Sequence, residues 1–176
     1  ADTQRYVYLS DFLLGTAGHT YGANGIWQIN SEEMPYGASP HGAHWGNTSW
    51  KEAMNLDGSK HISHCMKYLT SFEWWNFKYH PEWVEKPCSL DACDGHFSAS
   101  IPGKIRVIYK PHFGGSFFGE INVLNIEKDV NYKAYRFNPI TGKETPLGDV
   151  TPDIEGKWKF PRVDAFQDWI YMLKAE

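Results

Sequence analysis

The chain has 176 residues and a formal net charge of −4, and aromatic side chains make up 16% of it, including eight Trp. This length excludes a complete TIM barrel, which takes about 250 residues, and allows one large core or two small ones. The acidic balance disfavours nucleic-acid binding, and no apolar run approaches the about 20 residues of a membrane span, so we expect neither as a partner.

A helix is predicted at the start of the chain. Tyr6, Leu9 and Leu13 recur at helical spacing, and Asp2 or Thr3 can cap the first turn. Glycine at position 15 ends the pattern, as glycine commonly does after a helix. The sequence therefore predicts a helix between this cap and Gly15, with Phe12 beside the apolar positions.

The glycine-rich stretch 15–27, GTAGHTYGANGIW, follows the helix. Its glycines allow close backbone approach, and His19, Tyr21 and Trp27 supply polar atoms and flat apolar faces, which sugar rings require. We interpret these three side chains as substrate-binding residues. The alternative is a glycine-rich turn whose rings simply pack inward.

A loop rich in Gly, Pro and Ser is predicted from residue 30 to 47. Trp45 in this loop is interpreted as a stacking platform over a sugar, the alternative being a hydrophobic plug. His41 and His44 lie three residues apart, but a loop leaves their geometry open, and we expect hydrogen-bonded or solvated rings rather than metal ligands.

Two helices are predicted next. Thr48 or Ser49 can cap a short helix that starts at Trp50, and a second helix follows the break at residues 57–59 and runs to about residue 70. His61 and His64 lie one turn apart on the second helix, without a third ligand nearby, so we interpret them as surface or packing residues.

The sequence pattern changes near residue 81, where prolines and short apolar or alternating runs replace the helical period. Before it, residues 72–77 are predicted to form an apolar seam between the two parts. Six strands are predicted, at residues 98–101, 104–109, 120–126, 132–137, 156–160 and 169–173. Such strands with turns between them predict a small antiparallel β-sandwich, with residues 113–119 as a loop that either binds ligand or covers the sandwich.

Three cysteines are present. Cys88 and Cys93 can close a short disulfide loop if the protein is exported, which leaves Cys65 unpaired. A metal site of Cys88, Cys93 and His96 lacks a clear fourth ligand, so no metal and no other cofactor is expected.

Several segments together resemble one enzyme family. GTAGHTYGANGIW, the preceding RYVYLSDFLL and the later HWGNTSWKEAMNLDGSKHISHCMKYL resemble the end of the catalytic barrel in apiosidase-like bacterial glycoside hydrolases. The tail resembles the small C-terminal β domain of that family, which carries a "putative collagen-binding" label. FPRVDAFQDWIYML matches its closing strand, while RFNPITGKETPL matches its turn only in part, with Ile140 in place of the usual arginine.

The resemblance implies an α/β remnant, the last βα unit of a TIM barrel, at residues 1–80 and a β-sandwich domain at 81–176. It also implies that the catalytic acids come from earlier barrel strands, so no catalytic residue is assigned here. Glu32 and Glu33 are the nearest carboxylates to the glycine-rich stretch, and we expect them to be solvated.

Two functions are compatible with these features. The first is the C-terminal portion of a glycoside hydrolase acting on plant or microbial polysaccharide, completed by an upstream barrel fragment or another chain. The second is a non-catalytic carbohydrate- or collagen-binding module. Small sandwiches behind barrels often act mainly as structural buttresses, and a buried apolar face between helices and sandwich would support that role. Exposed, coplanar aromatics on the sandwich would support the binding module. A secreted or periplasmic location is expected in both cases.

Overall fold

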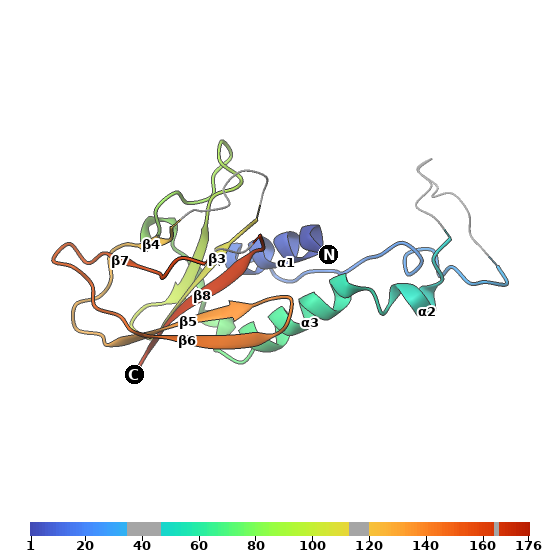
Figure 1. Ribbon diagram of the computed structural model, residues 1–176. Coiled ribbons are helices and arrows are strands. Elements are labelled where there is room, and N and C mark those ends of the chain that lie inside the picture. The colour runs from blue at the N-terminus through green and yellow to red at the C-terminus, as the bar shows by residue number, and fades with distance from the viewer. Residues whose placement is uncertain (35–46, 113–119, 164–165) are drawn as a thin grey trace.

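The computed structural model describes residues 1–34, 47–112, 120–163 and 166–176 (Figure 1). Helices are α1 (Asp2–Leu14), α2 (Trp50–Ala53) and α3 (Asp57–Leu69), with short 3-10 helices at Trp74–Asn76 and Pro81–Trp83. Strands are β1 (Lys78–Tyr79), β2 (Phe97–Ile101), β3 (Ile105–Lys110), β4 (Asn122–Val123), β5 (Tyr132–Asn138), β6 (Lys143–Asp149), β7 (Trp158–Lys159) and β8 (Trp169–Ala175).

Every strand pair is antiparallel. Six strands form one sheet in the order β1-β2-β3-β8-β5-β6, and β4 pairs with β7 in a separate two-stranded sheet. The expected antiparallel, β-rich second part is therefore confirmed. Its layers differ from a symmetric sandwich, because the second sheet has only two short strands.

The helices and the large sheet share one core. Alternate residues of β3, among them Val107 and Tyr109, face α1 and α3, whereas Ile108 faces the other side, as the period of two in a strand requires. The shared core comprises Tyr8, Leu9, Leu13, Ile62, Cys65, Leu69, Phe97, Ala99, Ile105, Val107, Tyr109, Phe137, Ile170 and Met172. Because both parts contribute to it, neither buries its apolar face without the other.

A second core lies on the opposite face of the sheet, under β4 and β7. It includes Ile108, Val123, Phe160, Tyr171 and Leu173. The large sheet is thus covered on one face by helices and on the other by the small sheet with its loops. Both faces are buried, which explains why β8 contains a continuous apolar run and why β2 and β3 are buried along almost their whole length.

The helices begin and end close to the predicted residues. Gly15 ends α1 with a φ of 80°, a left-handed conformation that glycine adopts without strain, and Ser49 caps α2 by accepting a hydrogen bond from the Glu52 N–H. The predicted cap of α1 was wrong, since Ala1 is the cap residue and Asp2 lies in the first turn. The predicted break at 57–59 was also wrong: Asp57 begins α3.

Two strands, the short β1 and the longer β6, were not predicted from the sequence. β6 lies at the edge of the large sheet, where it pairs only with β5, and its sequence contains Pro146. An edge strand tolerates proline and needs no buried face, so its apolar pattern is weak. No helix within the described ranges is long and apolar enough to cross a membrane.

Candidate functional site

The glycine-rich stretch runs back along α1. The Thr16 N–H donates to the Asp11 carbonyl at 3.1 Å, and the Gln4 side chain donates to the Gly22 carbonyl at 3.1 Å. Residues 16–22 thus run antiparallel to α1, and within the described residues they pair with no strand. At the far end of this segment, the Tyr21 hydroxyl lies near Gly58 of α3, so the stretch contacts both helices.

His19 is held between α1 and a cavity. Its Nδ1 lies 3.1 Å from the Asp11 carboxylate, and its ring packs edge-on against Tyr8 with centroids 5.5 Å apart. The second ring nitrogen, Nε2, is buried and has no hydrogen-bond partner among the described residues. The Asp11 contact orients the imidazole, because it fixes which ring nitrogen faces the carboxylate.

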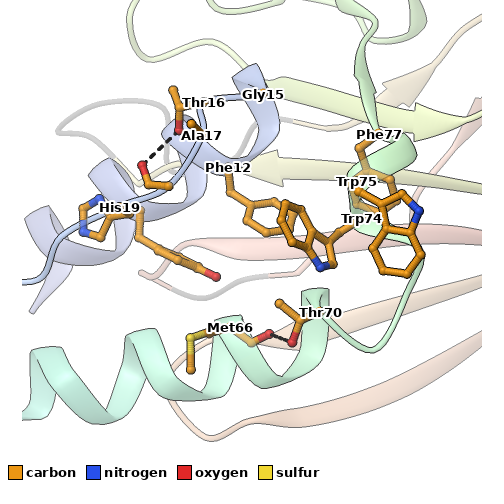
Figure 2. Close-up of a pocket in the computed structure, with 12 residues that line it drawn as sticks. Phe12, Gly15, Thr16, Ala17, His19, Met66, Thr70, Trp74, Trp75 and Phe77 are labelled. Carbon is orange, nitrogen blue, oxygen red and sulfur yellow. Dashed lines mark hydrogen bonds between the residues drawn. The ribbon is translucent and has the colours of Figure 1, made fainter.

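A cavity of about 260 Å³ opens beside His19 (Figure 2). Its wall combines the backbone of residues 15–19 with a set of mostly aromatic side chains: Tyr8, Phe12, Met66, Thr70, Trp74, Trp75 and Phe77. Trp74 and Trp75 lie nearly perpendicular, at 77°, and Trp75 is 66% exposed. Apolar ring faces beside an imidazole and backbone groups are suited to binding an apolar or amphipathic group, such as a sugar ring or an apolar side chain.

The structure does not bring together the three predicted binding residues that it describes, His19, Tyr21 and Trp27. Of these, His19 lines the cavity, whereas Tyr21 lies by the start of α3 and Trp27 is 72% exposed on a separate segment. Trp45 lies outside the described residues. Trp74 and Trp75 were predicted only as part of a seam, although two adjacent tryptophans directly after a helix are a signal for an aromatic wall.

An arm, which we define as residues 23–34 and 47–56, projects beyond the first turn of α1 (Figure 1). Asn30 connects the two segments of the arm. The Asn30 side chain donates to the Thr48 carbonyl at 2.9 Å, and the Asn30 carbonyl accepts from the Trp50 N–H at 2.8 Å. Gly25 packs so tightly that a Cβ would lie 2.5 Å from the Thr48 carbonyl oxygen. The arm is therefore an ordered local unit.

Large apolar side chains are exposed along the arm. They are Trp27, Ile29, Met34, Trp50, Met54 and Leu56. Exposed apolar groups of this number on one segment mark a surface that another molecule or chain segment covers. Glu33 lies in the same arm, and hydrogen bonds from its own backbone and from the Ser31 hydroxyl lower the pKa of its carboxyl. A glycosidase's general acid needs a raised pKa, so Glu33 is unsuited to that role.

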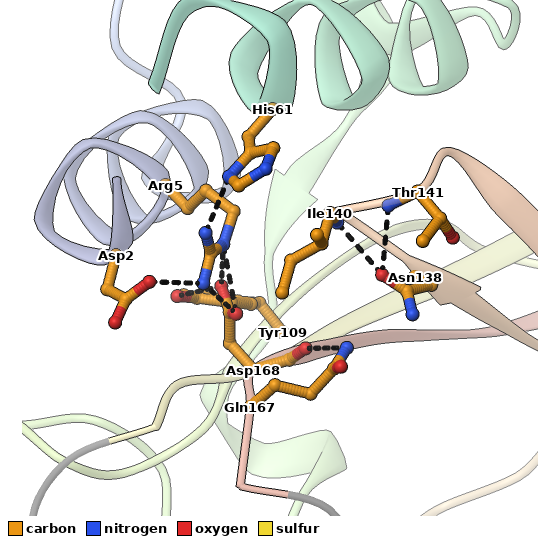
Figure 3. Close-up of polar contacts among 9 residues, drawn as sticks. All are labelled: Asp2, Arg5, His61, Tyr109, Asn138, Ile140, Thr141, Gln167 and Asp168. Atoms are coloured by element: carbon orange, nitrogen blue, oxygen red, sulfur yellow. Dashed lines mark hydrogen bonds and ion pairs between the residues drawn. The ribbon is translucent and has the colours of Figure 1, made fainter. Parts of the chain in front are cut away.

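A buried ion pair joins α1 to Asp168, the residue directly before β8 (Figure 3). The Arg5 guanidinium donates to both carboxylate oxygens of Asp168 at 2.7–3.0 Å, and both side chains are almost completely buried. Tyr109 also donates to Asp168 at 3.2 Å, and Arg5 reaches Asp2 and His61 at 2.8 Å. This network connects the helical part with two central strands of the sheet.

The stability of this network is predicted to depend on pH through His61. Burial, and then the positive charge of Arg5, lower the pKa of His61 below its ordinary 6.5. The folded chain therefore holds fewer protons on this ring than the unfolded chain, so the stabilisation is present above pH 6.5 and is lost as pH falls through the lowered pKa. We expect the urea concentration at the midpoint of unfolding to decrease as the pH is lowered from about 7 to about 5.

His61→Gln is the matched variant for that prediction. Glutamine can accept a hydrogen bond from Arg5 through its side-chain carbonyl and does not titrate. The pKa of His96 is also lowered by burial, but His96 is common to both proteins, so it does not affect their difference. If the urea midpoints of the unchanged chain and of His61→Gln depend equally on pH, the assignment of the pH dependence to His61 is refuted.

Of the histidines and cysteines predicted not to bind metal, His41 and His44 lie outside the described residues, whereas His64 and Cys65 have other contacts. The ring of His64 bonds to the Ile140 carbonyl at 3.1 Å, and Cys65 is buried in the shared core. Across the described ranges, no group of three or more His, Cys, Asp or Glu side chains could hold a metal ion. Cys88 and Cys93 are free thiols in this structure, and their disulfide stays a prediction.

Known proteins share both the sequence of the helical part and the fold of the whole. Residues 1–76 match the family model described as "Apiosidase-like, catalytic domain". No curated protein sequence matches the chain. A solved structure named as a glycoside hydrolase shares 16% identity with a TM-score of 0.73, covering 99% of this chain and 37% of its own.

Two further solved structures share the fold. A glycoside hydrolase family 5 protein from Bacteroides vulgatus is 17% identical, with a TM-score of 0.71, over 97% of this chain and 35% of its own. A cycloisomaltooligosaccharide glucanotransferase from Paenibacillus sp. is 10% identical, with a TM-score of 0.56, over 97% and 27%. The chain thus spans about a third of the length of these structures. Its resemblance to the apiosidase-like glycoside hydrolases is confirmed, over residues 1–76 by the family model and over nearly the whole chain by the shared fold.

Proposed function

We propose that the chain is the C-terminal portion of a glycoside hydrolase that acts on plant or microbial polysaccharide. Residues 1–80 supply the last βα unit of its barrel, and residues 81–176 form a β-sandwich domain that buttresses this unit. The observation that carries the proposal is the shared core, in which α1 and α3 of the matched catalytic segment pack directly on the large sheet.

The course of residues 16–22 supports the barrel assignment. The segment runs antiparallel to α1 and, because Tyr21 lies at the start of α3 while Thr16 and His19 lie by Met66 and Thr70, also antiparallel to α3. Helix, extended segment and helix in this order are the geometry of a barrel strand between its two flanking helices. In the complete barrel, the unpaired backbone of residues 16–22 would bond to neighbouring strands.

This direction also predicts which end is catalytic. Barrel active sites lie at the carboxyl ends of the strands, which here is the end of residues 16–22 that leads into the arm. Trp27 follows at that end and is exposed, so the upstream portion can cover it. We propose Trp45, which lies outside the described residues, as a sugar contact. His19 and Tyr21 contact the two helices and would support the substrate-binding strand from behind.

The cavity beside His19 lies at the opposite end, where α1 and α3 both terminate. We propose that apolar side chains of the remaining barrel fill it. The catalytic acids also belong to that remaining, upstream part. Its origin, in the same polypeptide or a second chain, does not change the chemistry, and a secreted or periplasmic enzyme suits a polymeric substrate.

The binding-module alternative is less well supported. It requires exposed, coplanar aromatic rings on the sandwich. In the described part of the sandwich, the large apolar side chains that are exposed are Leu90, Ile154 and Phe166, of which one is aromatic. The buried face between helices and sheet favours the buttress instead.

The proposal predicts that this chain assembles with the upstream part of the barrel when the two are mixed. We expect the chain and the upstream portion of an apiosidase-like barrel to form a one-to-one complex in light scattering, because the arm exposes apolar side chains to be covered. Trp27→Ser should weaken this complex about tenfold or more, the loss expected for one buried aromatic anchor. Phe166→Ser removes a ring of equal exposure, 73% against 72%, from the sandwich and should leave assembly unchanged.

Two results would count against the proposal. One is a chain that stays monomeric beside the barrel portion, and the other is equal weakening by both substitutions. Saturable binding of an isolated polysaccharide to the chain alone would favour the binding module, if no substitution in the arm abolishes that binding.

A further inference from the structure

The loop between the second 3-10 helix and β2 is closed tightly at its base. The Cys88 N–H donates to the His96 carbonyl at 2.8 Å, and the His96 N–H donates to the Lys86 carbonyl at 2.9 Å. Gly95 packs against Pro87, where a Cβ would lie 2.6 Å from the Pro87 carbonyl carbon. The two sides of the loop are therefore held side by side where Cys88 begins its tip.

The tip is a short hairpin. Ser89 and Ala92 exchange both backbone hydrogen bonds at 3.2 Å, around a loop of two residues. Cys88 and Cys93 flank this pair on the two sides of the hairpin, and the Gly95 N–H donates to the Ala92 carbonyl at 3.0 Å, so Cys93 lies in the turn that follows. The Cys88 thiol already lies 3.8 Å from the Cys93 carbonyl oxygen.

Both cysteines are also anchored from outside the loop. The Tyr6 hydroxyl of α1 donates to the Cys93 carbonyl at 3.2 Å, and the Tyr79 hydroxyl of β1 donates to the Cys88 carbonyl at 3.4 Å. The loop tip thus contacts the catalytic segment as well as the sheet. A rigid tip would preserve the contact between the loop and α1.

We propose that Cys88 and Cys93 form a disulfide that staples this loop against α1. In the reaction, the exposed Cys93 thiolate attacks a small-molecule disulfide and releases one thiol. Cys88 then attacks the mixed disulfide and releases the second, so two electrons and two protons pass to the oxidant. Cys65 is excluded as a partner because it is fully buried in the shared core. The assignment is independent of the proposed hydrolase function.

Thiol counting on the whole chain tests the disulfide. After incubation with oxidised glutathione, alkylation with iodoacetamide in denaturant should modify one cysteine, Cys65, and should modify three after reduction. Peptide mapping should recover residues 88 and 93 in one cross-linked peptide. Three alkylated cysteines before reduction, or glutathione retained on either residue, would overturn the proposal.

The stapling role has its own readout. Dithiothreitol should lower the Tm of the oxidised chain by about 5 °C, the effect of opening a short cross-linked loop. The double variant Cys88→Ser, Cys93→Ser should show no response to dithiothreitol, whereas Cys65→Ala should keep it. A disulfide without this Tm response would show that the bond forms but does not staple the loop.

Discussion

Arg5→Met is expected to destabilise the fold by about 3–5 kcal/mol, since breaking a buried ion pair leaves an uncompensated charge. Methionine preserves much of the side-chain volume but leaves the Asp168 carboxylate with Tyr109 as its remaining side-chain donor among the described contacts. Both charges are almost completely buried, so water cannot replace the lost guanidinium. Urea denaturation at pH 7, followed by circular dichroism, measures the loss.

The control for this substitution is an exposed ion pair. Lys104 contacts Glu73 at 3.0 Å with both side chains at least half exposed, so Lys104→Met should change stability by less than about 1 kcal/mol. Comparable losses in the two variants would contradict the role of the buried Arg5–Asp168 pair at the junction.

Leu9→Ala is expected to cost about 2–5 kcal/mol and to lower the stability of helices and sheet together. Leu9 is fully buried in the core formed by α1, α3 and the large sheet. Because this core is shared, far-ultraviolet circular dichroism and tryptophan fluorescence should report one coincident unfolding transition, shifted equally for both signals.

Val7→Ala on the same helix is the matched control. Val7 is 39% exposed, and its truncation should cost less than about 0.5 kcal/mol. If the circular dichroism and fluorescence transitions of Leu9→Ala have different midpoints, helices and sheet unfold as two independent units. That result would refute the buttress.

Local patterns predicted most of the secondary structure. Leu9 and Leu13 mark the buried stripe of α1, and the alternation along β3 and β5 marks two buried faces. Strand lengths were less predictable in the small sheet. Only Asn122–Val123 pairs where residues 120–126 were expected, because the buried Arg106 bonds to the Leu124 carbonyl and Asn125 has a φ of 53°. Those features depend on a residue from another strand.

The candidate site was only partly predictable for the same reason. His19 was identified from its glycine-rich surroundings, but its cavity is completed by Trp74 and Trp75, which lie more than fifty residues later. The Arg5–Asp168 pair joins residues 163 positions apart. An aspartate before an apolar closing strand was visible in the sequence, whereas its partner depends on how α1 packs on β8.

The proposed hydrolase function would be tested by reconstituting activity from the two portions. Release of reducing sugar from a panel of plant and microbial polysaccharides would be measured for the chain, for the upstream portion of an apiosidase-like barrel, and for the two mixed. We expect hydrolysis only by the mixture, because the proposed function assigns the catalytic acids to the upstream portion and the arm to this chain. Hydrolysis by the chain alone, or an upstream portion whose activity is unchanged by the chain, would contradict it.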